Sequence, residues 1–325
     1  MKENIRPKVL VSREIPAEGM DILREHCEVT VGAEDRMLKR EELLALIPGM
    51  DGLLSMLTDR VDGEVMDAAP GLKVISNYAV GYDNIDVGEA YRRGIAVTNT
   101  PGVLTDATAD LAWALLMDAA RRVTEGDRLN RAGGWKEWAP MFHLGKEVTG
   151  STLGIVGMGR IGRAVAKRAR GFDMKVVYFS RRRKDPKEEN RLGIRYLPFR
   201  ELLREADFVS LHAPYTRKTR HLIGREELSL MKETAFLINT ARGGLVDEKA
   251  LVEALKAGEI AGAGLDVYED EPRLSPGLKQ LPNAVLAPHL GSATRETRGQ
   301  MARRAAENIV AELLGEGSST RVPPE

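Results

Sequence analysis

The stretch TLGIVGMGRIGRAVAKRARGF, residues 152–172, decides the fold of this chain. A β-branched apolar run leads into the glycine loop GMGRIG at 157–162, and a run with helical spacing follows. Between a strand and a helix, such glycines allow a tight turn, close approach of a pyrophosphate and close helix packing. We expect a dinucleotide-binding unit here, although an ordinary glycine-rich turn is the alternative. The phosphate-binding residues would be Gly157, Met158, Gly159, Arg160, Ile161 and Gly162.

Apolar or β-branched runs alternate with helical patterns on both sides of this unit. Upstream, we predict strands over 8–11, 28–31, 52–57, 73–76 and 95–98, with a helix over 40–47. From residue 152 onward, the predicted strands read TLGIVG, KVVYFS, DFVSLHAP, TAFLINT, GAGLDV and NAVLAPH. This alternation predicts an α/β protein with two doubly wound parallel sheets.

Two polar segments mark where the chain would cross between the sheets. TPGVLTD at 100–106 breaks the first series, and Thr105 or Asp106 could cap a long helix. Gly291-Ser292 opens a last helix that reaches about Leu314. If that helix packs on the first series, one domain comprises residues 1–99 and 292–325 and the other residues 100–291. The ligand cleft would then lie between the two domains.

Composition favours a small-molecule ligand. Lysine plus arginine equals aspartate plus glutamate at 48 each, so no net charge draws the chain to nucleic acid or to an anionic membrane. No apolar run is long enough for a membrane span or a secretory signal. The single cysteine, Cys27, suits the reducing cytoplasm, and the residues show no metal-ligand cluster.

The end of the second strand of the 152–289 series bears on the choice of cofactor. An NAD site places a carboxylate there for the ribose 2′-hydroxyl, but this chain has Ser180-Arg181-Arg182-Arg183. A hydroxyl and two guanidinium groups can bind a 2′-phosphate that a carboxylate would repel. Ser180, Arg181 and Arg182 therefore favour NADP(H), with NAD possible. The alternative is that the basic run is a solvated turn.

Three later strands end in residues that can do chemistry. Arg242 follows TAFLINT, Asp266 and Glu271 follow GAGLDV, and His289 follows NAVLAPH. Open parallel sheets bind ligands beyond the carboxyl ends of their strands, so these side chains are candidates for one site.

Further motifs carry a family resemblance over nearly the whole chain. They are YAVGYDNID at 78–86, NTPGVLTDATAD at 99–110, INTARGG at 238–244, GLDVYEDEP at 264–272 and APHLGSAT at 287–294. The chain resembles the D-isomer-specific 2-hydroxyacid dehydrogenases, and within them is most similar to the glyoxylate and hydroxypyruvate reductases. The resemblance implies a Rossmann dinucleotide-binding domain inserted in a flavodoxin-like substrate domain.

The resemblance also implies roles for particular residues. A small 2-keto acid such as glyoxylate or hydroxypyruvate would take hydride from NAD(P)H. Arg242 would bind its carboxylate and polarise its carbonyl, and His289 would donate the proton. Glu271 would accept a hydrogen bond from the other ring nitrogen of His289, and the N–H groups of Val80 and Gly81 would bind the anion. The cofactor groove would be lined by Pro214, Thr219, Thr240, Ala241, Asp266 and Gly291.

Two alternatives to this activity are open. The chain could be another member of the family, acting on phosphoglycerate, formate or phosphite. It could also be a dinucleotide-sensing corepressor, since such proteins share the fold.

Trp135 and Trp138 lie in an otherwise polar stretch. They could anchor a homodimer, and Trp138 could reach the substrate pocket of a neighbouring subunit. Packing within their own subunit is the other interpretation.

Overall fold

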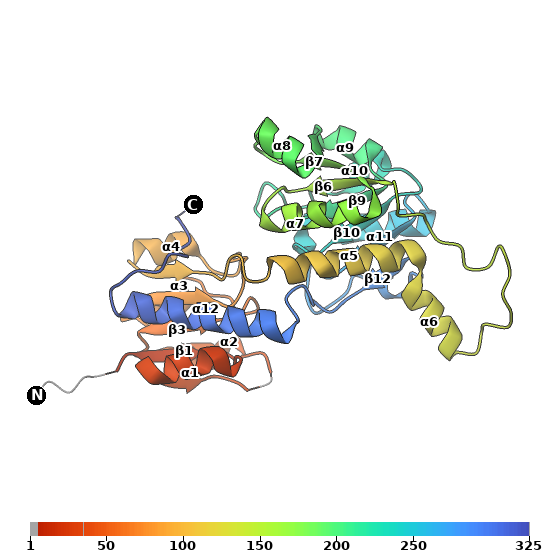
Figure 1. Ribbon diagram of the computed structural model, residues 1–325. Coiled ribbons are helices and arrows are strands. Elements are labelled where there is room, and N and C mark those ends of the chain that lie inside the picture. Colours follow the sequence, from red (N-terminus) through yellow and green to blue (C-terminus); the bar gives the residue numbers. More distant parts are fainter. Residues whose placement is uncertain (1–5, 35, 325) are drawn as a thin grey trace, which may run out of the picture. The chain divides into compact units, whose positions relative to one another are not determined.

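The computed structural model describes residues 6–34 and 36–324. Contacts divide the chain into two compact units, one reaching to Leu104 and resuming at Ala293, the other running from Thr105 to Ser292. The first unit is thus built from both ends of the chain (Figure 1). We expected the crossings after residue 99 and before residue 292. Residues 100–104 instead belong to the first unit, where the Thr100 N–H donates to the Ala79 carbonyl at 2.9 Å.

The first unit contains a five-stranded sheet, ordered β2-β1-β3-β4-β5 with every pair parallel. This is the flavodoxin-like order. β3 and β4 are buried at every residue, as strands covered by helices on both faces are. The strands are β1 Lys8–Val11, β2 Glu28–Val31, β3 Gly52–Ser55, β4 Val74–Asn77 and β5 Ala96–Thr98. The helices are α1 Ala17–His26, α2 Arg40–Leu46, α3 Gly63–Asp67, α4 Val87–Arg92 and α12 Arg295–Leu313.

Helix α12 returns the chain to the first unit. It packs beside α1 and over β3 and β4 (Figure 1), burying Ala302, Ala305 and Ile309 completely. Our prediction that this helix opens at Gly291-Ser292 was wrong by a few residues. The helix begins at Arg295, because the side chain of Thr294 accepts the Thr297 N–H and caps it.

The second unit contains a seven-stranded parallel sheet, ordered β12-β11-β10-β9-β6-β7-β8. Counted from β6, this is the Rossmann order with one strand added beyond the sixth. The two sheets confirm the predicted fold class. The strands are β6 Thr152–Val156, β7 Lys175–Phe179, β8 Ile194–Tyr196, β9 Phe208–Leu211, β10 Phe236–Asn239, β11 Gly262–Leu265 and β12 Ala284–Leu286. The helices are α5 Thr105–Arg121, α6 Val123–Arg131, α7 Arg160–Ala169, α8 Pro186–Leu192, α9 Phe199–Glu205, α10 Arg225–Leu230 and α11 Glu248–Ala257, with 3-10 turns η1 Arg170–Phe172, η2 Gly243–Leu245 and η3 Leu278–Gln280.

Strand β8 was missed by the sequence analysis. It has only three residues, lies at the edge of the sheet and alternates without a long apolar run. Pairing with β7 therefore defines this strand more than its own residues do.

Helix α6 and the segment that follows it project from the second unit (Figure 1). Trp135 and Trp138 on this segment are 55% and 78% exposed, so neither packs into the core of its own subunit. Among the described residues, no helix has both the length and the apolar character needed to cross a membrane.

Candidate active site

The glycine loop joins β6 to α7 in the second unit. Gly157 has a φ of 103°, and a side chain there would meet the backbone of His212 at 2.5 Å. A Cβ on Gly162 would lie 2.2 Å from the Gly157 carbonyl oxygen. A side chain at either position would force the backbone to shift, whereas a Cβ on Gly159 would meet open space. The loop thus keeps room over the free N–H groups at the start of α7, where a pyrophosphate fits.

A second candidate contact for the cofactor lies beyond β10. The hydroxyl of Thr240 is buried and has no hydrogen-bond partner among the described residues. Asn239 shapes this turn, since its side chain donates to the Arg242 carbonyl at 2.9 Å and accepts the Ala241 N–H at 3.1 Å. A buried, unpartnered hydroxyl at a strand end suits a bound polar ligand. Sequence reasoning missed Asn239, although its position inside INTARGG was a signal.

The basic run after β7 divides into two parts. Arg183 is bound to Glu189 at 2.8 and 2.9 Å, and the buried Tyr178 hydroxyl donates to the same carboxylate at 2.7 Å. These partners lower the pKa of Glu189 to about 2, the Arg183 hydrogen bond contributing most. Arg181 and Arg182 are exposed and form no ion pair with the carboxylates that the structure describes. Of the three arginines in this run, Arg181 and Arg182 are therefore the two without an ion pair among the described residues.

The loop between β9 and α10 holds two of the predicted groove residues. The Thr219 hydroxyl donates to the Pro214 carbonyl at 2.8 Å and accepts the Thr216 N–H at 2.8 Å, which closes the turn. His212 precedes this turn, with its ring nitrogen 2.8 Å from the Ser210 hydroxyl. Desolvation lowers the pKa of His212 to about 4, so the ring is neutral near pH 7.

The structure brings Glu271 and His289 together. Nδ1 of His289 lies 2.8 Å from Oε2 of Glu271, while Oε1 accepts the Tyr268 N–H at 3.0 Å. Burial opposes ionisation of Glu271, but the hydrogen bond and charge of His289 outweigh it and hold the pKa of Glu271 below its usual value. The carboxylate therefore orients the ring through Nδ1 and leaves Nε2 as the atom able to face a substrate.

Backbone geometry fixes the direction of His289. The residue adopts the left-handed region, with a φ of 54°, and its N–H donates to the Asp266 carbonyl at 3.0 Å. The Asp266 side chain, fully buried, accepts the N–H groups of Leu290 at 2.6 Å and Gly291 at 2.8 Å. Burial raises the pKa of Asp266, although these hydrogen bonds and the nearby His289 oppose the rise. Asp266 and Gly291 thus belong to the turn that presents His289.

Arg242 lies at the same edge of the sheet, directly before η2. Its Nη1 donates to the Ala241 carbonyl at 2.9 Å, and its charge is one of the influences that lower the pKa of Glu271. Arg242, Glu271 and His289 therefore come from loops that follow β10, β11 and β12, three strands adjacent in the sheet. A cation for an anionic substrate and a histidine oriented by a carboxylate are the parts that carbonyl reduction needs.

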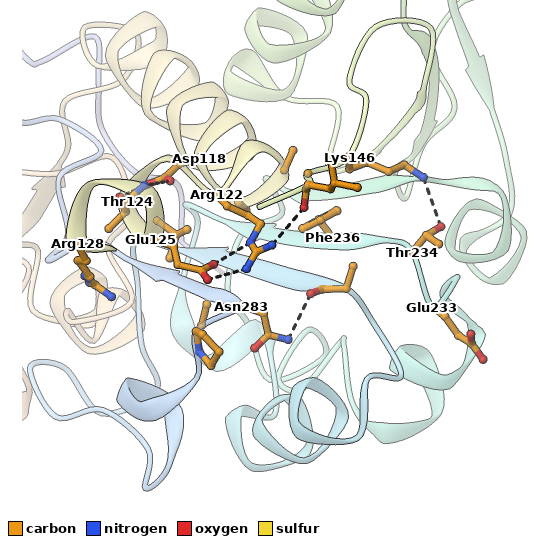
Figure 2. Close-up of a pocket in the computed structure, with 18 residues that line it drawn as sticks. Asp118, Arg122, Thr124, Glu125, Arg128, Lys146, Glu233, Thr234, Phe236 and Asn283 are labelled. Atoms are coloured by element: carbon orange, nitrogen blue, oxygen red, sulfur yellow. Dashed lines mark hydrogen bonds and ion pairs between the residues drawn. The ribbon is translucent and has the colours of Figure 1, made fainter. Parts of the chain in front are cut away.

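A cavity of about 440 Å³ lies at the opposite edge of this sheet (Figure 2). Phe236 and Ala284, which line it, are the first residues of β10 and β12. Near them Arg122 pairs with Glu125 at 2.6 Å. Because the candidate catalytic residues follow the last residues of these strands, the cavity is separate from them.

Val80 and Gly81, the predicted anion-binding residues, lie in the first unit in the loop that follows β4. The described residues contain no cluster of side chains suited to a metal ion.

Fold and site together define a nicotinamide-dependent oxidoreductase. The chain belongs to the D-isomer specific 2-hydroxyacid dehydrogenase family, whose NAD binding domain matches residues 113–291. It therefore uses a nicotinamide dinucleotide as cofactor, and the residues described above fit that group.

Relatives match over nearly their whole length. A glyoxylate reductase of Thermococcus kodakarensis is 54% identical over 99% of this chain and 97% of its own. One of Korarchaeum cryptofilum is also 54% identical, over 98% of this chain and 95% of its own. Among solved structures, an NADPH-dependent glyoxylate/hydroxypyruvate reductase of Sinorhizobium meliloti, in complex with NADP and malonate, has a TM-score of 0.86 and 33% identity, covering 98% of this chain and 97% of that one.

Proposed function

We propose that this protein reduces glyoxylate or hydroxypyruvate, both small 2-keto acids, to the corresponding 2-hydroxy acid. The observation that carries the proposal is the Glu271–His289 hydrogen bond beside Arg242, in a chain 54% identical to a glyoxylate reductase. A bound NAD(P)H supplies the hydride.

The side chains of the second unit divide the remaining work. Arg242 binds the substrate carboxylate and polarises the carbonyl. Its planar guanidinium group suits it to this role, because it can donate two parallel hydrogen bonds to an anion. His289 donates a proton from Nε2 to the carbonyl oxygen as negative charge develops there. Glu271 holds the ring through Nδ1 and stabilises the protonated imidazole before transfer. Separately, we propose Val80 and Gly81 of the first unit as donors of backbone N–H groups to a substrate carboxylate.

The direct test is turnover. Purified protein, incubated with NADPH and a panel of 2-keto acids, should oxidise NADPH fastest with glyoxylate or hydroxypyruvate, followed as loss of absorbance. Pyruvate, 3-phosphohydroxypyruvate and oxaloacetate serve as comparisons. Absence of turnover with every keto acid would contradict the proposal, and preference for the phosphorylated substrate would move the protein to another activity of the family.

We further propose that NADPH is preferred over NADH. Support comes from the two exposed arginines, Arg181 and Arg182, which lie beside Ser180 without a carboxylate partner among the described residues. Replacing both by alanine should raise the KM for NADPH about tenfold or more and leave the KM for NADH within about twofold, because only NADPH carries the 2′-phosphate. Arg183→Ala is the matched control, since that guanidinium is bound to Glu189. A wild-type kcat/KM that favours NADH would refute the preference.

Exposure of Trp135 and Trp138 supports a homodimer built through the segment after α6. Burying two such side chains in a partner is the usual way an interface gains affinity. Trp135→Ser combined with Trp138→Ser should shift the mass measured by light scattering from dimer to monomer, and a wild-type monomer would contradict the proposal.

We also propose that the protein works in the cytoplasm. Its single cysteine, Cys27, is buried and suits that reducing compartment.

A further inference from the structure

The loop that follows β4 has an unusual set of acceptors. Three consecutive carbonyls each receive a hydrogen bond from within the first unit: Ala79 from the Thr100 N–H at 2.9 Å, Val80 from the Asn99 side chain at 2.8 Å and Gly81 from the Asn77 side chain at 2.7 Å. Two of the three donors are asparagine side chains.

A carbonyl group that accepts a hydrogen bond fixes the direction of the N–H group of the next residue. In a trans peptide, the C=O and the following N–H point in opposite directions within one plane. The bond to Ala79 therefore directs the Val80 N–H, the bond to Val80 directs the Gly81 N–H, and the bond to Gly81 directs the Tyr82 N–H. None of these three N–H groups donates to an acceptor in the part of the chain that the structure describes. Backbone N–H groups without a protein acceptor are available to donate to a bound anion.

We propose that Asn99 and Asn77 are positioning residues that aim these N–H groups at the carboxylate of the substrate. The proposal rests on the proposed function and extends it. Asn99 has the more direct effect, because it orients the peptide that carries the Gly81 N–H. Asn77 acts on the next peptide, which carries the Tyr82 N–H.

Both asparagines are held firmly themselves. Asn77, at the end of β4, is fully buried and accepts the Ser55 hydroxyl at 3.1 Å. It also donates to Asn84 at 3.0 Å. The backbone carbonyl of Asn99 accepts the side chain of Asn308, on α12, at 3.0 Å. We call Asn77 and Asn99 the clamp. Because both residues are held in place, they orient the peptides before the anion binds, and no rearrangement is needed on binding. Such pre-organised donors increase affinity.

Asn99→Ala tests the proposal in the full-length protein. Removing the side-chain donor frees the Val80 carbonyl, so the Gly81 N–H loses its fixed direction. We expect the KM for glyoxylate and the Ki for oxalate, a competing carboxylate, to rise about tenfold, because a hydrogen bond to a charged group is at stake. The kcat and the KM for NADPH should stay within about threefold, since the carboxylate does not react.

Asn283→Ala is the matched control. Asn283 also donates to two backbone carbonyls, those of Leu255 and Ala261, but in the second unit and at the cavity edge of its sheet. Its replacement should lower Tm in a similar way and leave the KM for glyoxylate within about twofold. Asn99→Asp keeps the side-chain volume while removing the donor. If the alanine variant does not fold, the same rise in the KM for glyoxylate and the Ki for oxalate is expected of Asn99→Asp.

Each outcome has a definite reading. A selective rise in KM and Ki supports the clamp. Unchanged values in a variant that still reduces glyoxylate, or an equal change in the control, overturn the clamp and leave the proposed function standing. Wild-type protein without turnover of glyoxylate overturns the proposed function, and this inference with it.

Discussion

Replacing Glu271 by glutamine tests the arrangement on which the chemistry depends. In the wild type, one carboxylate oxygen accepts from His289 Nδ1 and the other accepts from the Tyr268 N–H, so both oxygens act as acceptors. A glutamine has one acceptor and one donor end. If its oxygen keeps the Tyr268 N–H, its NH₂ group faces Nδ1 and can bond only to a ring whose Nδ1 carries no proton. That neutral ring cannot protonate the substrate, because its remaining N–H is not acidic near pH 7.

The structure gives the size of the effect. In the variant, protonating the His289 ring has two costs. One charge-assisted hydrogen bond is lost, at about 1.5–3 kcal/mol, and the glutamine NH₂ group faces the Nδ1–H group, donor against donor, at about 1–3 kcal/mol. Together these amount to roughly 2.5–6 kcal/mol, which predicts a fall in kcat of about 10²- to 10⁴-fold. The KM for NADPH should change little.

Glu269→Gln is the matched control for this experiment. Glu269 lies on the same loop and pairs with a different histidine, His221, at 2.5 Å. Its replacement should leave kcat within about threefold. If Glu271→Gln also kept kcat within about threefold, the role assigned to Glu271 would be wrong.

Three further predictions concern single residues. His289→Gln should lower kcat by about 10²-fold or more while the Kd of NADPH, measured by fluorescence, stays nearly constant; retained turnover would exclude His289 as proton donor. The folded-state pKa of His212, about 4, lies below the 6.5 that is ordinary for a histidine, so the unfolded chain binds more protons between those values. Stability therefore falls as pH drops through that window. Denaturant unfolding should show a loss of roughly 2–3 kcal/mol there, which His212→Asn removes; an equal loss in the variant would contradict this. Gly162→Ala should lower Tm by about 4–10 °C, because its Cβ would meet the Gly157 carbonyl at 2.2 Å, whereas Gly171→Ala, where a Cβ meets nothing within 4 Å, should not; equal Tm values would refute the packing argument.

Much of the fold could be predicted because strand patterns are local. Lys8–Val11 and Glu28–Val31 occur where their apolar and β-branched residues indicated, and α2 ends one residue before the predicted boundary. β8 could not be predicted, since three edge residues carry too little pattern and depend on pairing with β7. The start of α12 also depended on a contact, the cap from Thr294, rather than on the preceding glycine.

The site shows the same division. The positions of Arg242, Glu271 and His289 beyond the strand ends could be predicted from the sequence, because parallel strands bring their carboxyl ends to one edge. That Arg183 is bound to Glu189 rather than available to a phosphate could not be read in this way.

The sequence by itself determined the two parallel sheets, the glycine loop and the order of the candidate catalytic residues, since each depends on neighbours within a few positions. Only the tertiary structure decided which polar groups have hydrogen-bond or ion-pair partners within the described residues and which do not. Asn99 lies 19 positions from Val80, yet its side chain binds the Val80 carbonyl. Hydrogen-bond partners far apart in the chain are chosen by three-dimensional proximity, which no local pattern of residues records.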